Sequence, residues 1–270
     1  GRQAFARKTG EFSLTVTALG TKTVMAQLLF YENVAPVSPQ RHGELSIERA
    51  DFGFAANVNS VPLMAVEMTA AASEYTIVFA GNEEAVAPVV ILGLEGTKNQ
   101  YVDDDGKWNA DYIPAFVRRY PFVFSQQDNT YTLCVDESWD GCNKEGKGER
   151  LFDEKGERTE YLSRMLKFLE ESQAHFVRTQ TYCQHLKEMD LLEPMKADFT
   201  LPGGEKKSLG GFMAINRDKL RNLAPEKLAE LAKTDELELT YIHLLSMNNF
   251  RRVLERTAKA NAVAAPAAAE

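Results

Sequence analysis

The chain has 270 residues, and its 31 lysines and arginines against 39 aspartates and glutamates leave a formal net charge of −8. With 44% hydrophobic and 26% charged residues, the composition is that of a globular protein and excludes collagen-like, low-complexity and largely disordered classes. The negative charge argues against nucleic acid as a partner, since such binding needs a basic face. No apolar run approaches the ~20 residues of a membrane helix, so we expect no direct membrane insertion.

Residues 1–23 are interpreted as an N-terminal extension, in which an apolar–polar alternation over 12–17 indicates a short strand and not a signal peptide. From 24 to 135 the chain is rich in short apolar runs bounded by Gly, Pro and Asn, which predict strands. A short helix is expected between Pro114 and Pro121, with Pro114 in its first turn. The expected strands are 24–31, 52–58, 61–68, 75–80, 86–94 and 131–135.

The second half is predicted to be helical. Thr159 is a suitable N-cap for a helix over 159–190, whose apolar stripe contains Leu162, Leu166, Leu169, Phe176, Cys183 and Leu186. A hairpin is expected from 197–201 and 209–215, followed by short helices at 216–223 and 225–233 and a closing helix at 237–258. The prediction is an α+β fold, with a strand-rich N-terminal half (an antiparallel or mixed sheet) packed against a helical C-terminal half. The expected domain spans 24–258, and 259–270 is expected to be a disordered, alanine-rich tail.

The cysteines and histidines do not follow the spacing of any known metal site. Cys134, Cys142 and Cys183 contain no CxxC pair, and HExxH is absent. The acidic runs at 103–106 and 152–157 lack oxygen ligands where a calcium loop needs them. We therefore expect no metal or other cofactor, three free thiols, and residence in the cytoplasm.

No nucleophile elbow, SxxK motif or phosphate-binding loop is present, so the sequence identifies no catalytic residue. This absence favours a non-enzymatic role without excluding catalysis. Carboxylates are numerous, but the sequence does not pair any two of them.

The segment 112–122 carries the most distinctive local chemistry. Arg118 and Arg119 lie among aromatic residues that include Tyr112 and Tyr120, and arginine both stacks on aromatic rings and pairs with carboxylate or phosphate. Adjacent helical residues point about 100° apart, so the two arginines are expected to divide their roles. One should anchor the segment to the acidic loop 103–105, and the other should face a cleft or partner surface with Tyr112 and Tyr120. The simpler alternative is that both arginines only tie down the acidic loop.

Polar residues also interrupt the apolar faces of two predicted helices. They are Gln173 and Gln180 on the long helix, and Tyr241, His243, Asn248 and Asn249 on the closing helix. Buried amide and imidazole groups need hydrogen-bond partners, which either a core network or a ligand cleft supplies. A core network is favoured, while His243 and Asn248 are kept as ligand- or partner-binding candidates beside the arginine segment.

Several blocks resemble the SapC family, bacterial proteins named for surface-layer-associated gene clusters. The matching blocks are LLFYENVAPVS at 28–38, 54–62 leading to YTIVF at 75–79, YVDDDGKWNADYIPAFVRRYPF at 101–122, LFDEKGERTEYL at 151–162, LLEP at 191–194 and TYIHLLSMNNFRRVL at 240–254. Members usually begin near the first block, which is consistent with 1–23 being an extension. The resemblance implies a link to the surface layer and a gene neighbourhood with outer-membrane transporters, cupin-like proteins and flavin halogenases, but no catalytic residue set.

Two functions follow as expectations. The first is a non-enzymatic accessory or binding protein of a cell-envelope system, acting inside the cell on a protein partner or a small acidic ligand. The alternative is an enzyme, or the obligate partner of an enzyme, that works on a small molecule or peptide beside oxygenase- or halogenase-like proteins. A cell-surface location would require an unusual export route, because no signal peptide is recognised.

Overall fold

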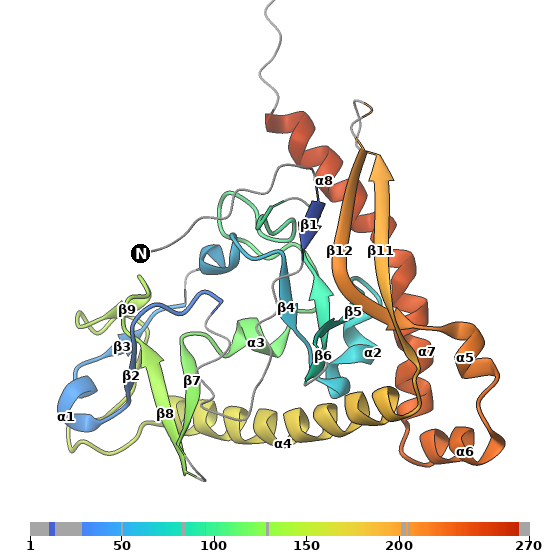
Figure 1. The fold of residues 1–270 in the computed structure, drawn as a ribbon. Helices are drawn as coiled ribbons and strands as arrows, with labels where there is room; N and C mark the ends of the chain where they lie inside the picture. The colour runs from blue at the N-terminus through green and yellow to red at the C-terminus, as the bar shows by residue number, and fades with distance from the viewer. Residues whose placement is uncertain are drawn as a thin grey trace, which may run out of the picture.

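The computed structural model describes residues 11–13, 29–49, 51–82, 85–94, 96–127, 130–200, 204 and 206–264. The expected α+β class is confirmed: antiparallel sheets lie mainly in the first half, and the long helices follow (Figure 1). Most of the expected extension 1–23, and residues 265–270 of the expected tail, lie outside the described residues. The helices are α1 (Pro39–His42), α2 (Met68–Ala71), α3 (Ala115–Arg118), α4 (Glu160–Glu188), α5 (Arg217–Arg221), α6 (Pro225–Lys233), α7 (Glu236–Ser246) and α8 (Phe250–Ala264).

The largest sheet is mixed and has the strand order β1-β12-β5-β6-β4, with β11 pairing the other side of β12. Only β1 and β12 run parallel among its described pairs. Its strands are β1 (Glu11–Ser13), β4 (Ser60–Pro62), β5 (Thr76–Gly81), β6 (Val86–Ile91), β11 (Leu192–Thr200) and β12 (Lys206–Ile215). The core of this region joins buried residues of β5 and β6 to the C-terminal part of α4 and to α7 and α8.

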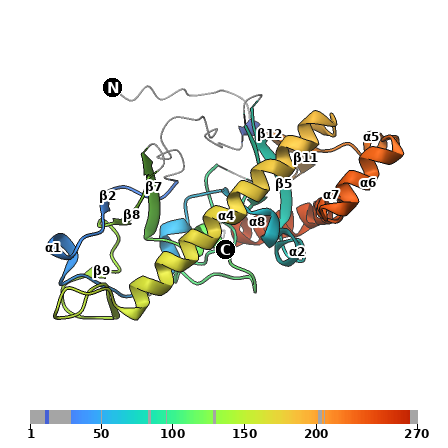
Figure 2. The ribbon, with the colours of Figure 1, turned by 90° about the horizontal axis from the view of Figure 1, so that it is seen from below.

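Two small antiparallel sheets lie at the other end of the molecule. One has the order β2-β8-β7 and consists of β2 (Val34–Pro36), β7 (Phe122–Gln127) and β8 (Thr130–Asp136). The other has the order β10-β3-β9 and consists of β3 (Ser46–Ile47), β9 (Cys142–Asn143) and β10 (Glu149–Arg150). Their side chains form a second core with the N-terminal part of α4. Seen from below, α4 crosses from these sheets to the α5–α7 region (Figure 2).

Helix α4 is 29 residues long, so it extends about 43 Å and contributes to both cores. The hydroxyl of Thr159 accepts the N–H of Leu162, as the N-cap prediction requires. Leu162 and Leu169 are buried, whereas Leu166 and Phe176 are only half-buried. The predicted apolar stripe is therefore correct in position, but part of it borders an open groove described below.

Several predicted elements differ from the structure. Residues 52–58 form a 3₁₀ turn (Gly53–Ala55) and not a strand, because Phe52 and Phe54 pack into an aromatic cluster. The predicted strand 61–68 covers β4, a second 3₁₀ turn (Ala65–Glu67) and the start of α2. Strand β7 was not predicted, and residues 29–31 of the expected strand 24–31 are not in a strand.

The predicted closing helix is divided by a third 3₁₀ turn, Met247–Asn249, between α7 and α8. At this turn the amide of Asn249 donates to the carbonyls of Ala72 and Tyr75, which ties the break to the sheet layer. Helix α8 continues to Ala264, beyond the predicted end at 258. Within the described part of the chain, no helix combines the length and apolarity needed to cross a bilayer.

Candidate functional site

Two acidic side chains from the 65–74 region hold the start of the 112–122 segment. The buried carboxylate of Glu67 accepts the N–H groups of Met64 and Ala115, at 2.9 and 2.7 Å, and the hydroxyl of Tyr112 at 2.7 Å. The carboxylate of Glu74 accepts the N–H groups of Asp111 and Tyr112. Glu67 thus satisfies a main-chain donor at the N-terminus of α3, where a helix leaves such groups unpaired.

The expectation that an arginine anchors the segment to the acidic loop 103–105 is wrong. The carboxylate of Asp103 instead accepts the N–H groups of Asp105 and Lys107 and the amide of Asn109. These bonds close a tight loop and lower the pKa of Asp103. The anchoring acids, Glu67 and Glu74, lie 37 to 48 positions away in the sequence, and they accept main-chain N–H groups and the Tyr112 hydroxyl, not guanidinium groups.

The loop at 153–157 repeats this arrangement. The carboxylate of Asp153 accepts the N–H groups of Lys155 and Glu157, and Gly156 takes a φ of 79°, close to the 75° of Gly106 in the first loop. Each glycine supplies a left-handed backbone conformation that other residues rarely adopt. Both aspartates therefore cap their own loops. Among the described residues no group of three or more His, Cys, Asp or Glu side chains is placed to hold a metal ion.

Arg118 and Arg119 contact different neighbours, as expected for adjacent residues of a helix, whose side chains point about 100° apart. Arg118 is exposed: its Nε donates to the carbonyl of Ile113 at 2.9 Å, and its guanidinium lies 5.3 Å from the ring centroid of Phe168 on α4 and 5.9 Å from that of Tyr112. Arg119 is half-buried, with its guanidinium 4.2 Å from the ring centroid of Phe116. The Nε of Arg119 is buried and has no hydrogen-bond partner among the described residues.

Tyr120 belongs to the aromatic core and does not face a cleft with Tyr112. It is 3% exposed, its ring stacks 4.2 Å from that of Phe54, and its hydroxyl donates to Asp136. Desolvation, reinforced by the negative charge of Asp136, raises the pKa of Tyr120. Of the four predicted residues in this segment, only Arg118 is exposed, while Tyr112 and Arg119 are half-buried.

A third arginine, which sequence reasoning did not select, joins Arg118 at the surface. The Nη2 of Arg49 donates to the carbonyls of Arg118 and Tyr120, each at 2.7 Å. Desolvation, together with the positive charge of Arg118, lowers the pKa of Arg49. None of the ion pairs formed among the described residues includes Arg49, Arg118 or Arg119. No local motif marked Arg49, since the contact joins positions 69 residues apart.

His243 is part of the core and does not meet the arginine segment. It is fully buried; its Nδ1–H donates to the carbonyl of Ile77 on β5 at 2.9 Å, and its Nε2 accepts the N–H of Ile215 on β12 at 3.1 Å. Ser246 completes this bridge, because its hydroxyl accepts the N–H of Ile77. Burial lowers the pKa of His243 to about 4, so the ring is neutral at pH 7. Asn248 is exposed, on a different side of the helix from His243.

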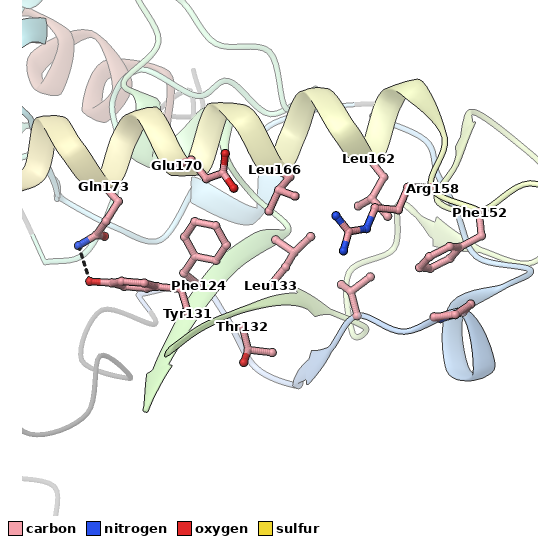
Figure 3. A pocket seen from close by; sticks show the side chains of 12 residues that line it. Phe124, Tyr131, Thr132, Leu133, Phe152, Arg158, Leu162, Leu166, Glu170 and Gln173 are labelled. Atoms are coloured by element: carbon pink, nitrogen blue, oxygen red, sulfur yellow. Dashed lines mark hydrogen bonds between the residues drawn. The ribbon is translucent and has the colours of Figure 1, made fainter. Parts of the chain in front are cut away.

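A groove of about 640 Å³ lies between α4 and the β2-β8-β7 sheet (Figure 3). Its floor is apolar, with Phe124 and Leu133 from the sheet facing Leu162 and Leu166 from the helix. At one end the amide of Gln173 donates to the hydroxyl of Tyr131 at 3.1 Å. Gln173 was singled out in the sequence as a polar interruption, whereas Gln180, chosen with it, is simply exposed. Leu162 and Leu166 were expected on the apolar stripe of the helix, but nothing in the sequence indicated that they would meet the sheet residues in a groove, because these come from separate segments.

Comparison with known proteins agrees with the resemblance seen in the sequence. No curated protein and no solved structure matches the chain. The family model for SapC matches residues 37–253, a span that includes the arginine segment, the groove and the His243 bridge. The chain therefore belongs to the SapC family.

Proposed function

We propose that this protein is a non-enzymatic accessory protein of a surface-layer-associated cell-envelope system, and that it binds an acidic partner inside the cell through Arg49 and Arg118. The observation that carries the proposal is that Arg49 donates to the main-chain carbonyl of the exposed Arg118, while neither arginine takes part in an ion pair among the described residues. The link to the envelope rests on the resemblance to the SapC family, and the binding role rests on the geometry of the arginine pair.

Acidic residues outnumber basic residues in this chain, so most surface arginines could find a carboxylate partner within it. Arg49 and Arg118 are therefore distinguished by having none among the described residues. Arg118 is exposed and uses Nε for the carbonyl of Ile113, and its guanidinium also interacts with the Tyr112 side chain, so the terminal N–H donors that remain can pair with a carboxylate. The aromatic rings of Tyr112 and Phe168 hold its guanidinium plane in place, so that less conformational entropy is lost on binding. Arg49 adds a second positive charge beside it.

One histidine and one cysteine, side chains of types that often catalyse reactions at neutral pH, are engaged in the core. Both ring nitrogens of His243 bond to the sheet backbone, and burial raises the pKa of the Cys183 thiol to about 12. These observations favour binding over acid–base or thiol catalysis.

The test is binding of a fluorescent hexaglutamate peptide, with citrate as a small-acid competitor. We expect Arg118→Gln to weaken binding about tenfold, which corresponds to 1.4 kcal/mol, and to leave the melting temperature unchanged. Binding should also weaken as the salt concentration rises. If citrate displaces the labelled peptide at the same concentration as unlabelled hexaglutamate does, the partner is a small acid. If only hexaglutamate displaces it, the partner is an acidic protein segment.

The matched control is Arg164→Gln, which removes an exposed arginine of α4 that pairs with Glu160 at 3.0 Å. This variant should bind hexaglutamate like the wild type, because the charge that it removes is already paired with Glu160. An equal loss in both variants would show that only net charge matters, and it would contradict the proposal.

A further inference from the structure

The groove beneath α4 carries two opposite charges that have no partner within the described part of the chain. Arg158, from the loop before α4, and Glu170, on the helix itself, both line it. Both side chains are exposed, and neither has a hydrogen bond or ion pair among the described residues. In Figure 3 the guanidinium of Arg158 lies beside Leu162, and Leu166 lies between it and Glu170. The two charges therefore flank an apolar floor instead of neutralising each other.

The spacing of these charges sets the length of a matching ligand. Leu162, which lies beside Arg158, and Glu170 are eight residues apart on one helix, so the two charges are separated by about 12 Å along α4. An extended peptide advances about 3.3–3.6 Å per residue, so three to four residues bridge this distance. The volume of about 640 Å³ also lies within the range that small-ligand sites occupy.

The polar groups beside Glu170 suit an amino group. The Oε1 of Gln173 has no described partner, while the Nε2 of the same amide is held by Tyr131. The carboxylate of Glu170 and this carbonyl oxygen are both acceptors, as an ammonium group requires. At the other end the guanidinium of Arg158 offers the paired donors that a carboxylate requires.

We propose that the groove binds a short free peptide of three to four residues with apolar side chains. Its C-terminal carboxylate pairs with Arg158, its amino group pairs with Glu170, and its side chains cover Phe124, Leu133 and Leu166. This site is separate from the arginine pair, because Arg118 lies over Phe168, about 200° around α4 from Leu166. Failure at either site therefore leaves the other proposal intact.

The experiment uses the full chain and a library of tetrapeptides built from Ala, Val, Leu and Phe. Native mass spectrometry first identifies retained peptides, and calorimetry then measures their dissociation constants. Each retained peptide is compared in three forms: with free termini, N-acetylated, and C-amidated. Decanoate serves as a carboxylic acid that lacks an amino group.

We expect the free form to bind at least tenfold more tightly than either blocked form and than decanoate. Arg158→Met should bind the free and amidated peptides equally, and Glu170→Gln should bind the free and acetylated peptides equally. Because Arg158 and Glu170 are exposed and form no ion pair with the residues that the structure describes, both variants should keep the wild-type melting temperature. The controls Arg164→Met and Glu171→Gln change exposed charges outside the groove, and they should retain the wild-type preference.

Three results would overturn the proposal. The first is that no peptide of the library is retained. The second is that blocked and free forms bind equally well to the wild type. The third is that decanoate binds as tightly as the best peptide, which would identify the groove as a site for an apolar monocarboxylic acid and leave Glu170 without a role.

Discussion

Replacing His243 by phenylalanine tests the bridge that joins the ends of β5 and β12. Phenylalanine keeps a planar ring of similar size but removes both ring nitrogens. The N–H of Ile215 and the carbonyl of Ile77 are then buried without their imidazole partner. Each unpaired buried group costs about 1–3 kcal/mol, so we expect His243→Phe to lower the free energy of unfolding by about 2–6 kcal/mol at pH 7.5.

The pH dependence of this loss is a sharper test than its size. Burial lowers the pKa of His243 to about 4, whereas an unfolded histidine titrates near 6.5. Between these values the unfolded chain binds more protons at this site than the folded chain, so the wild type loses stability as the pH falls from 6.5 to 4. At 1.36 kcal/mol per pH unit, the loss reaches about 3 kcal/mol.

His243→Phe has no such site, so the stability gap between the two proteins should narrow by about 3 kcal/mol between pH 7.5 and pH 4. Urea unfolding of both proteins, followed by circular dichroism, measures this gap, and all other titrating groups cancel in the difference. Ser246→Ala is the matched control, because it removes a hydrogen bond to Ile77 without removing a titrating group. Its gap to the wild type should stay constant with pH. A gap for His243→Phe that stays constant or widens in acid would refute the reasoning.

Three further predictions concern stability and thiol chemistry. Glu67→Ala leaves three donors without their acceptor and should lower the free energy of unfolding by about 3 kcal/mol or more. The control is Glu171→Ala, which removes an exposed carboxylate of α4, and an equal effect of this variant would argue against the capping role of Glu67. Leu169→Ala should cost about 2–5 kcal/mol in urea unfolding, because the side chain is only 3% exposed; a loss below that of half-buried Leu166→Ala would contradict the packing. Burial raises the pKa of Cys142 and Cys183 to about 12, so a thiol reagent at pH 8 should react slowly with the folded protein; three thiols should react after unfolding without reductant, and a count of one would indicate a disulfide.

The parts of the fold that the sequence predicted well depend on short-range interactions. Helix α4 lies within two residues of its predicted bounds because Thr159 caps it and because its apolar residues recur with helical spacing. Helix α6 agrees with its predicted bounds, since Pro225 suits a first helical turn. In both cases the signal and the structure lie within a few residues of each other.

Where the sequence was misleading, apolar residues served a purpose other than forming a strand. Residues 52–58 look like a strand by composition, yet Phe52 and Phe54 stack on aromatic side chains from distant segments. Apolar runs of this length do not distinguish a strand from a turn that contributes to a core. Only the three-dimensional neighbours of these rings decide between the two.

The sequence by itself identified the family blocks, the α+β class and an arginine segment with distinctive chemistry. Tertiary structure decided which acids hold that segment, brought Arg49 to Arg118, placed His243 in the core, and opened a groove between α4 and a sheet. These contacts join residues tens to well over a hundred positions apart, and local spacing carries no information about such pairs. Hydrogen bonding explains the difference physically: a cap or a helical repeat is satisfied within one turn, whereas a buried carboxylate or imidazole takes whichever donors and acceptors the packed chain presents.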